Sequence, residues 1–106
     1  MKTTHSLFLK KNTAFKRVNI EDITLLEADN NYTTIYTQED CYVYAVVLKK
    51  IEEKMPKSVF KRVHRSYMIN LEAVEGFEGN TLFVQNKRVP VSRKYREEIF
   101  GLLDIL

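Results

Sequence analysis

Apolar and polar residues alternate over short stretches of the chain, which is the pattern of strands with one buried face. Clusters of Asn, Asp, Gly and Lys separate these stretches and favour turns, at 11–13, 19–22, 29–31, 38–40, 76–80 and 86–87. The pattern predicts strands at 6–10, 14–18, 23–28, 32–37, 41–45, 59–64, 67–70, 81–85 and 88–91. Residues 23–28 are apolar enough for a strand buried on both faces.

A helical period replaces the alternation in the middle of the chain. The apolar residues that recur at helical spacing there are Val47, Leu48, Ile51 and Met55, with charged residues between them. We expect this short helix to end at Pro56, because the residue before a proline resists the helical conformation.

A second helix is expected at the C-terminal end. Its apolar stripe comprises Ile99, Leu102, Leu103 and Leu106. The hydroxyl of Ser92 is expected to cap it by accepting a hydrogen bond from an amide of the first turn. Pro90 cannot donate to a strand ladder, so its strand is placed at a sheet edge or ends there. Strands outnumber helices, so the predicted fold class is mainly β with two short helices.

Composition narrows the class of protein. The 106 residues are 44% hydrophobic and 29% charged, which predicts a single globular domain over 1–106. The single cysteine, Cys41, excludes an intramolecular disulfide, and two histidines 59 positions apart give no zinc-site spacing. No apolar run approaches the ~18–20 residues of a membrane span. We therefore expect a cytoplasmic protein with no membrane segment, no metal and no cofactor.

Charge is distributed unevenly along the chain. The formal net charge is +3, but residues 54–96 carry ten bases and only three acids. Residues 1–20 carry five bases and no acid, whereas residues 21–53 are acidic. Such segregation is compatible with a face that binds a polyanion, and equally with an ordinary solvated surface.

The richest polar segment is 61–67. Its strand parity is imperfect, which predicts a kink near Val63. Arg65 could form two hydrogen bonds with a guanine edge, while Lys61 and Ser66 could reach phosphates. The alternatives are a structural role for His64, bonding a neighbouring backbone group, and an ordinary surface arginine at position 65.

Two other segments carry candidate chemistry. Arg93, Lys94 and Arg96 begin the second helix, where the helix dipole disfavours cations unless an anion binds there. Asn30 and Asn31 follow a buried strand, and asparagine can pair with two atoms of adenine in a major groove. The alternatives are a solvated first turn and a plain Asn-rich turn.

These segments together resemble the LytTR DNA-binding domain, the output domain of LytR/AgrA-type bacterial response regulators in two-component systems. The resemblance covers about 7–103 and rests on 23–32, 48–56, 60–70 and 89–95. Its most specific parts are Phe-x-x-Val-His-Arg-Ser-Tyr at 60–67 and Pro-Val-Ser-Arg at 90–93. It implies an elongated β-β-β arrangement of small antiparallel sheets, whose loops enter successive major grooves without a recognition helix.

Carried over by position, the resemblance implies two sets of DNA-contacting residues. The residues that would contact bases are Asn30, Asn31, Arg65 and Arg93. Those that would contact the DNA backbone or support the loops are Lys61, His64, Ser66, Tyr67, Ser92 and Lys94. The implied partner is double-stranded DNA, in imperfect direct repeats that bind two copies of the domain.

The chain departs from the family pattern in two respects. Val47 stands where many members have a serine before the short helix, so that helix is expected to begin less sharply. The receiver domain usual upstream is absent from the chain. The chain is therefore either an output domain excised from a longer protein, with a receiver domain or sensor system as its partner, or a free-standing regulator.

Other functions compete with this one. Six tyrosines could serve a small β-barrel that binds single-stranded nucleic acid by stacking. The chain could instead be a protein-interaction module. A hydrolase would need Cys41 beside His5 or His64, and nothing else in the chain supports catalysis.

Overall fold

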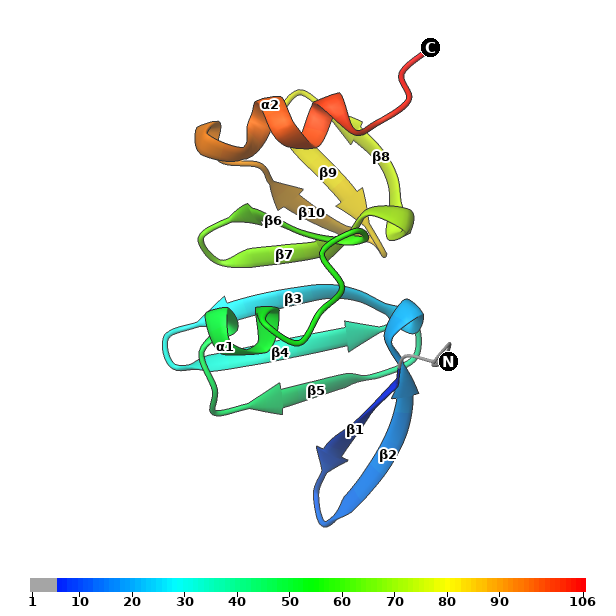
Figure 1. Ribbon diagram of the computed structural model, residues 1–106, viewed down its shortest axis with the longest axis vertical. Coiled ribbons are helices and arrows are strands. Elements are labelled where there is room, and N and C mark those ends of the chain that lie inside the picture. The colour runs from blue at the N-terminus through cyan, green and yellow to red at the C-terminus, as the bar shows by residue number, and fades with distance from the viewer. Residues whose placement is uncertain (1–5) are drawn as a thin grey trace.

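The computed structural model describes residues 6–106, and Figure 1 shows them as small antiparallel sheets stacked along the long axis, with two short helices. The strands are β1 (Ser6–Lys11), β2 (Ala14–Asn19), β3 (Ile23–Asp29), β4 (Tyr32–Thr37), β5 (Cys41–Tyr44), β6 (Phe60–His64), β7 (Tyr67–Asn70), β8 (Val74–Glu78), β9 (Thr81–Val84) and β10 (Lys87–Pro90). The helices are α1 (Leu48–Glu52) and α2 (Arg93–Gly101), with 3₁₀ turns η1 (Ile20–Asp22) and η2 (Leu71–Ala73). The predicted mainly β class is confirmed.

Strand β3 is the spine of the fold. It lies in the middle of a five-stranded sheet with the order β5-β4-β3-β7-β6, and every neighbouring pair is antiparallel. Residues 23–26 are all buried, as expected for a strand covered on both faces. Leu26 packs into one hydrophobic core and Leu25 into the other. The first hairpin, β1 with β2, and the three-stranded sheet β10-β9-β8 lie beyond the two faces.

Two separate cores hold these layers together. The first joins one face of the central sheet to the β1–β2 hairpin and α1, through Leu9, Val18, Ile35 and Leu48. The second joins the other face to the three-stranded sheet and α2, through residues that include Ile69, Leu82, Val89 and Ile99. Burial of these side chains is the main source of stability, because it removes apolar surface from water.

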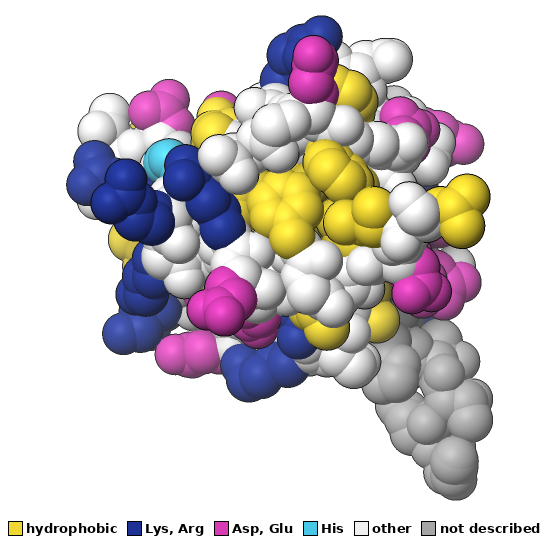
Figure 2. All heavy atoms as spheres, turned by 90° about the horizontal axis from the view of Figure 1, so that it is seen from above, with side chains coloured by type: hydrophobic (Ala, Val, Ile, Leu, Met, Phe, Trp, Pro, Cys, Tyr) yellow, Lys and Arg dark blue, Asp and Glu magenta, His cyan; other side chains and the backbone are white. Residues whose placement is uncertain are grey.

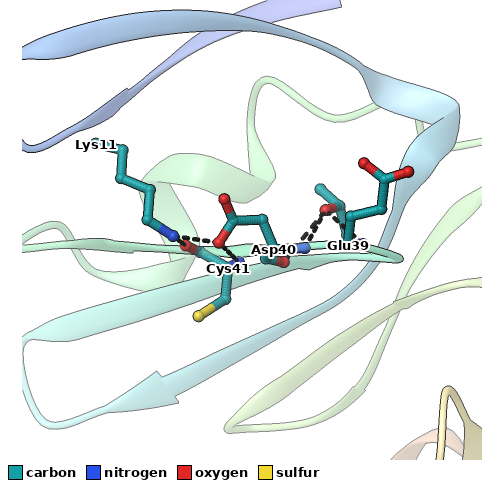
Figure 3. A network of polar contacts seen from close by, with 5 residues as sticks. Lys11, Glu39, Asp40 and Cys41 are labelled. Atoms are coloured by element: carbon teal, nitrogen blue, oxygen red, sulfur yellow. Dashed lines mark hydrogen bonds and ion pairs between the residues drawn. The ribbon is translucent and has the colours of Figure 1, made fainter.

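A polar network attaches the β1–β2 hairpin to the β4–β5 turn (Figure 3). The ammonium of Lys11 donates to the carboxylate of Asp40 and, over 2.9 Å, to the carbonyl oxygen of Cys41. The backbone N–H of Cys41 donates to Oδ1 of Asp40 at 2.8 Å. The hydrogen bond between the two side chains lowers the pKa of Asp40 and raises the pKa of Lys11. Both groups are solvent-exposed, so the pair orients the hairpin more than it stabilises it.

The sequence pattern placed most strands correctly but missed part of the three-stranded sheet. Strand β8 and the 3₁₀ turn η2 were not expected. Within the turn expected at 19–22, residues 20–22 form the 3₁₀ turn η1. The turn expected at 86–87 is one residue earlier, because Gln85 and Asn86 both adopt left-handed backbone conformations, with φ of 51° and 65°. Strand β9 begins at Thr81 as expected but ends one residue early, and β10 begins and ends one residue earlier than expected. The edge position expected for Pro90 is confirmed, since β10 is an outer strand.

Both helices are shorter than their apolar spacing predicts. Helix α1 ends at Glu52, before Pro56, and begins after Val47 without a side-chain cap, in keeping with the missing serine. Helix α2 ends at Gly101, so Leu102 and Leu106 are exposed and only the first part of the expected stripe is buried. Ser92 does precede α2, but its hydroxyl makes no capping hydrogen bond. It faces the carbonyl oxygen of Val63 instead, at 3.5 Å.

Candidate nucleic-acid interface

Three connections lie on the same side of the molecule and follow one another along its long axis (Figure 1). They are the β3–β4 turn at Asn30 and Asn31, the β6–β7 turn at Arg65 and Ser66, and the first turn of α2. Figure 2 views the molecule from the α2 end and shows Lys and Arg side chains gathered on this side. We call this surface the basic edge; it comprises Asn30, Asn31, Arg65, Ser66, Arg93 and Lys94.

The β3–β4 turn is a two-residue connection made of asparagines. Asp29 pairs with Tyr32 across the hairpin, so only Asn30 and Asn31 lie outside the ladder. Asn30 has a φ of 57°, a left-handed conformation that asparagine tolerates better than most residues. Both side chains are exposed to solvent, so their amides are free to meet a partner.

The β6–β7 turn begins with the kink that the sequence pattern predicts. The register of the β6–β7 pair shifts between Arg62 and His64, which allows both Phe60 and Val63 to be buried. The backbone N–H of Ser66 donates to Nδ1 of His64 at 3.1 Å. His64 therefore bonds a neighbouring backbone group, as in the structural alternative. Arg65, between the two bonded residues, is exposed.

The start of α2 presents cations at the end of the helix that disfavours them. Arg93 is the first helical residue and Lys94 the second, both are exposed, and no acid stands in the first turn. Arg96 is used differently, because its Nε donates to the carbonyl oxygen of Val91 at 3.1 Å. Tyr95 packs against the second core. Arg93 and Lys94 are thus exposed cations, whereas Arg96 stabilises the backbone just before the helix.

Two backbone hydrogen bonds fix the three connections relative to one another. The N–H of Ala28, near the end of β3, donates to the carbonyl oxygen of Ser66 at 2.8 Å. The N–H of Ser92 donates to the carbonyl oxygen of Val63 at 2.9 Å. The β6–β7 hairpin is therefore hydrogen-bonded to β3, which leads into the β3–β4 turn. It is also hydrogen-bonded to Ser92, the residue that precedes α2. Such backbone ties limit the motion of the exposed side chains that the connections carry.

Within residues 6–106, no carboxylate forms an ion pair with a cation of the basic edge. Between residues 6 and 106, carboxylates lie within 4.0 Å of only two cationic side chains, Lys11 and Arg62. Arg65, Arg93 and Lys94 belong to neither pair, so a phosphate or a base edge would meet no internal competitor. Lys61 is placed differently: it lines a hollow of about 240 Å³ together with Tyr95 and Glu98 of α2. The structure does not bring Lys61 into the β6–β7 turn.

Glu27 lies on β3, three residues before Asn30, and was not among the expected site residues. It is half-buried on β3, directly opposite Thr34 of β4 and Tyr67 of β7. The hydroxyl of Tyr36 donates to its Oε1 at 3.2 Å. Burial, together with this carboxylate, raises the pKa of both Tyr36 and Tyr67, so both hydroxyls stay protonated. The only signal in the sequence is an acid directly after the buried residues 23–26 of β3.

The tyrosines of the second hairpin do not form a stacking platform. Tyr42 is buried, Tyr44 packs against the first core and Tyr36 against the second. Only Tyr32 is strongly exposed, at 53%. Nor are the tyrosines of the two strands direct partners, because Tyr42 pairs with Ile35 and Tyr44 with Thr33. A face built for stacking single-stranded bases needs several exposed rings together.

The arrangement also separates the residues that a cysteine hydrolase would need. Cys41 begins β5 and His64 ends β6, and these strands are the two opposite edges of the five-stranded sheet. His5 lies outside the described residues. In the part of the chain that the structure describes, no three metal-ligating side chains gather. None of its helices has the length and apolar character needed to cross a bilayer.

Known proteins are similar to this chain in sequence and in fold. The family described as the LytTr DNA-binding domain matches residues 13–104. A solved LytTr DNA-binding domain from Bacillus cereus superimposes with a TM-score of 0.79 at 27% identity, covering 97% of this chain and 100% of that one.

Longer curated proteins are similar in sequence as well. The sensory transduction protein LytT of Bacillus anthracis is 33% identical over 107 residues, which cover 95% of this chain but 44% of that protein. The heme-containing CO-sensing transcriptional regulator RcoM 1 of Paraburkholderia xenovorans is 31% identical over 96 residues, covering 84% of this chain and 36% of that protein. The chain thus spans less than half the length of these relatives.

Proposed function

Because the chain belongs to the LytTR family of DNA-binding domains, we propose that it binds double-stranded DNA sequence-specifically and regulates transcription, without catalysing a reaction. The observation that carries this proposal is the basic edge: three connections on one side of the molecule, tied together by backbone hydrogen bonds and carrying unpaired cations. We propose that recognition uses these connections, two turns between strands and the first turn of α2, rather than the length of a helix lying in a groove.

The dimensions of the molecule suit a docking mode along the duplex. Its longest extent is 44 Å, and one turn of DNA rises about 34–36 Å. We propose that the β3–β4 turn and the start of α2 enter successive major grooves on one side, with the β6–β7 turn between them. Asn31 and Arg93 would then contact bases about one turn apart.

Roles for the individual side chains follow from their chemistry and exposure. Arg65 and Arg93 present planar guanidinium groups that match the O6 and N7 acceptors of guanine, and the amides of Asn30 and Asn31 match adenine. Lys94, Ser66 and His64 would contact the DNA backbone or support the turns. Tyr67 and Ser92 would support the turns. Lys61, which lies outside the basic edge, would contact phosphates next to it.

The partners of the domain follow from the family and from its relatives. We propose that two copies bind imperfect direct repeats, and that a receiver domain or another sensor controls them from outside this chain. Relatives named as a sensory transduction protein and as a CO-sensing regulator support the idea that different sensors are joined to such a domain. A regulator of bacterial transcription acts on DNA in the cytoplasm.

Binding is expected to weaken steeply with salt, because cations that contact phosphates release condensed counterions. On duplexes selected from a random pool, the log–log slope of affinity against salt should be about −0.9 per phosphate contact. Lys94→Ala should make this slope shallower by about one such contact and weaken all duplexes alike. Lys16→Ala, which removes an exposed lysine on β2 away from the basic edge, is the matched control and should change neither.

Fluorescence anisotropy on labelled oligonucleotides measures these slopes. A slope near zero for the native protein would contradict binding to nucleic acid altogether. Preference for the single strand over the duplex of the same sequence would favour a single-strand binder instead, and absence of binding to either would favour a protein-interaction module.

A further inference from the structure

The structure assigns Glu27 as a positioning residue for base reading: we infer that its carboxylate, through Tyr67 and His64, holds the β6–β7 turn in the conformation that presents Arg65. This inference rests on the proposed DNA-binding function and adds a residue that makes no contact with DNA itself. It rests on a chain of contacts that runs from the interior of the central sheet to the basic edge.

The first step is the unusual setting of the Glu27 carboxylate. It is half-buried, yet within residues 6–106 no lysine, arginine or histidine nitrogen lies within 4.0 Å of it. A carboxylate shielded from water must be compensated by hydrogen bonds. The compensation comes from tyrosines: the hydroxyl of Tyr36 donates to Oε1 at 3.2 Å, and Tyr67 stands directly opposite on β7. Glu27 therefore accepts a hydrogen bond from Tyr36 on β4 and faces Tyr67 on β7, whose pKa is raised by burial and by this carboxylate.

The second step connects Tyr67 to the turn. The rings of Tyr67 and His64 pack with their centroids 5.4 Å apart and their planes inclined by 59°. This contact sets the side on which the imidazole lies. From there, Nδ1 of His64 accepts the backbone N–H of Ser66 at 3.1 Å, which holds the turn closed around Arg65.

The third step is a backbone hydrogen bond between the β6–β7 turn and the residue after Glu27. The carbonyl oxygen of Ser66 accepts the N–H of Ala28 at 2.8 Å, so the residue after Glu27 holds the other side of the same turn. Arg65 is the exposed residue between two bonded neighbours, and its backbone direction is set by both bonds. Loss of the Glu27 acceptor would release Tyr67 and with it the imidazole, and would leave Arg65 less well oriented.

The test compares two substitutions of Glu27 with a matched control. Glu27→Leu removes the acceptor, whereas Glu27→Gln keeps an acceptor oxygen and removes only the charge. Glu52→Gln removes the charge of another half-buried carboxylate, which pairs with Arg62 and makes no contact with Tyr67 or His64. Specificity is measured as the ratio of the dissociation constant for a random duplex to that for the selected duplex.

Glu27→Leu should lower the specificity ratio about three- to tenfold, the range of one lost hydrogen bond, through weaker binding to the selected duplex. Glu27→Gln should retain most of the ratio, and Glu52→Gln all of it. In an Arg65→Ala background, Glu27→Leu should have almost no further effect, because the residue that it positions is gone. Full additivity of the two losses, or equal weakening on both duplexes, would overturn the inference.

A second measurement does not depend on DNA. In nitrogen-15 NMR spectra, Glu27→Leu and Tyr67→Phe should both shift the imidazole signals of His64 and the amide signal of Ser66, while Glu52→Gln should leave them in place. Unchanged His64 and Ser66 signals in Tyr67→Phe would overturn the relay even if Glu27→Leu failed to fold. Failure of the proposed function shows separately, as a native protein that does not discriminate between duplexes.

Discussion

Arg65→Ala is expected to weaken binding to the selected duplex by about 1–3 kcal/mol, roughly five- to 150-fold, while binding to random duplexes changes little. The reason is geometric. Arg65 is exposed in a turn whose neighbours on both sides are hydrogen-bonded, and no carboxylate pairs with it. A guanidinium held in this way can form two hydrogen bonds with guanine, which other bases cannot match.

The Arg65→Ala experiment has an internal control in Arg88→Ala. Arg88 is also an exposed arginine, but it lies on β10 over the ring of Phe83, outside the basic edge. Both variants remove one positive charge, so a purely electrostatic role would give similar losses on every duplex. Equal losses for Arg65→Ala on selected and random duplexes would make Arg65 a phosphate contact. The circular dichroism spectrum of the Arg65→Ala variant should match that of the native protein, because the Arg65 side chain belongs to neither hydrophobic core.

The largest expected effect on stability is at the centre of β3. Leu25→Ala and Leu26→Ala should each lower the free energy of unfolding by about 2–5 kcal/mol. Their side chains are 1% and 0% exposed and lie in different cores, so each substitution leaves a cavity on its own face of the sheet. Adjacent residues of a strand point to opposite faces, so in a strand with only one buried face one of the two substitutions to alanine would cost little stability.

Urea unfolding followed by circular dichroism measures these losses. Val43→Ala is the matched control, because Val43 is an apolar residue of the same sheet that is 61% exposed, and it should change stability by less than about 0.5 kcal/mol. A loss of that small size for either leucine would mean that its face of the central sheet is not covered.

The elements that could be predicted from sequence are those with strong local signals. Strands β3, β4 and β7 have dense apolar or β-branched residues bounded by turn-forming ones, and they were placed almost to the residue. Strand β8 was missed, because Val74–Glu78 contains a glycine and two acids and gains its extended form from pairing with β9. The end of α2 was misplaced because helical spacing continues through Leu106, although nothing packs there beyond Leu103.

The candidate site shows the same division. The residues of the turns were predicted from their chemistry and from the family resemblance, because the polar runs stand out in the sequence. The ties between the turns could not be predicted, since they join positions far apart in the chain through backbone atoms, as between Ala28 and Ser66. Likewise, Ser92 looks like a helix cap in sequence, but its hydroxyl lies 3.5 Å from the carbonyl oxygen of Val63 in a neighbouring strand.

The most direct test of the docking proposal is a map of base preference along the selected site. Affinities of the native protein, Asn31→Ala and Arg93→Ala are measured against every single-base variant of that duplex. The account predicts that Asn31→Ala relaxes preference at one end of the site and Arg93→Ala at the other, about one turn (~10 bp) away. Relaxation of the same base pairs by both variants would contradict docking of the basic edge along the duplex.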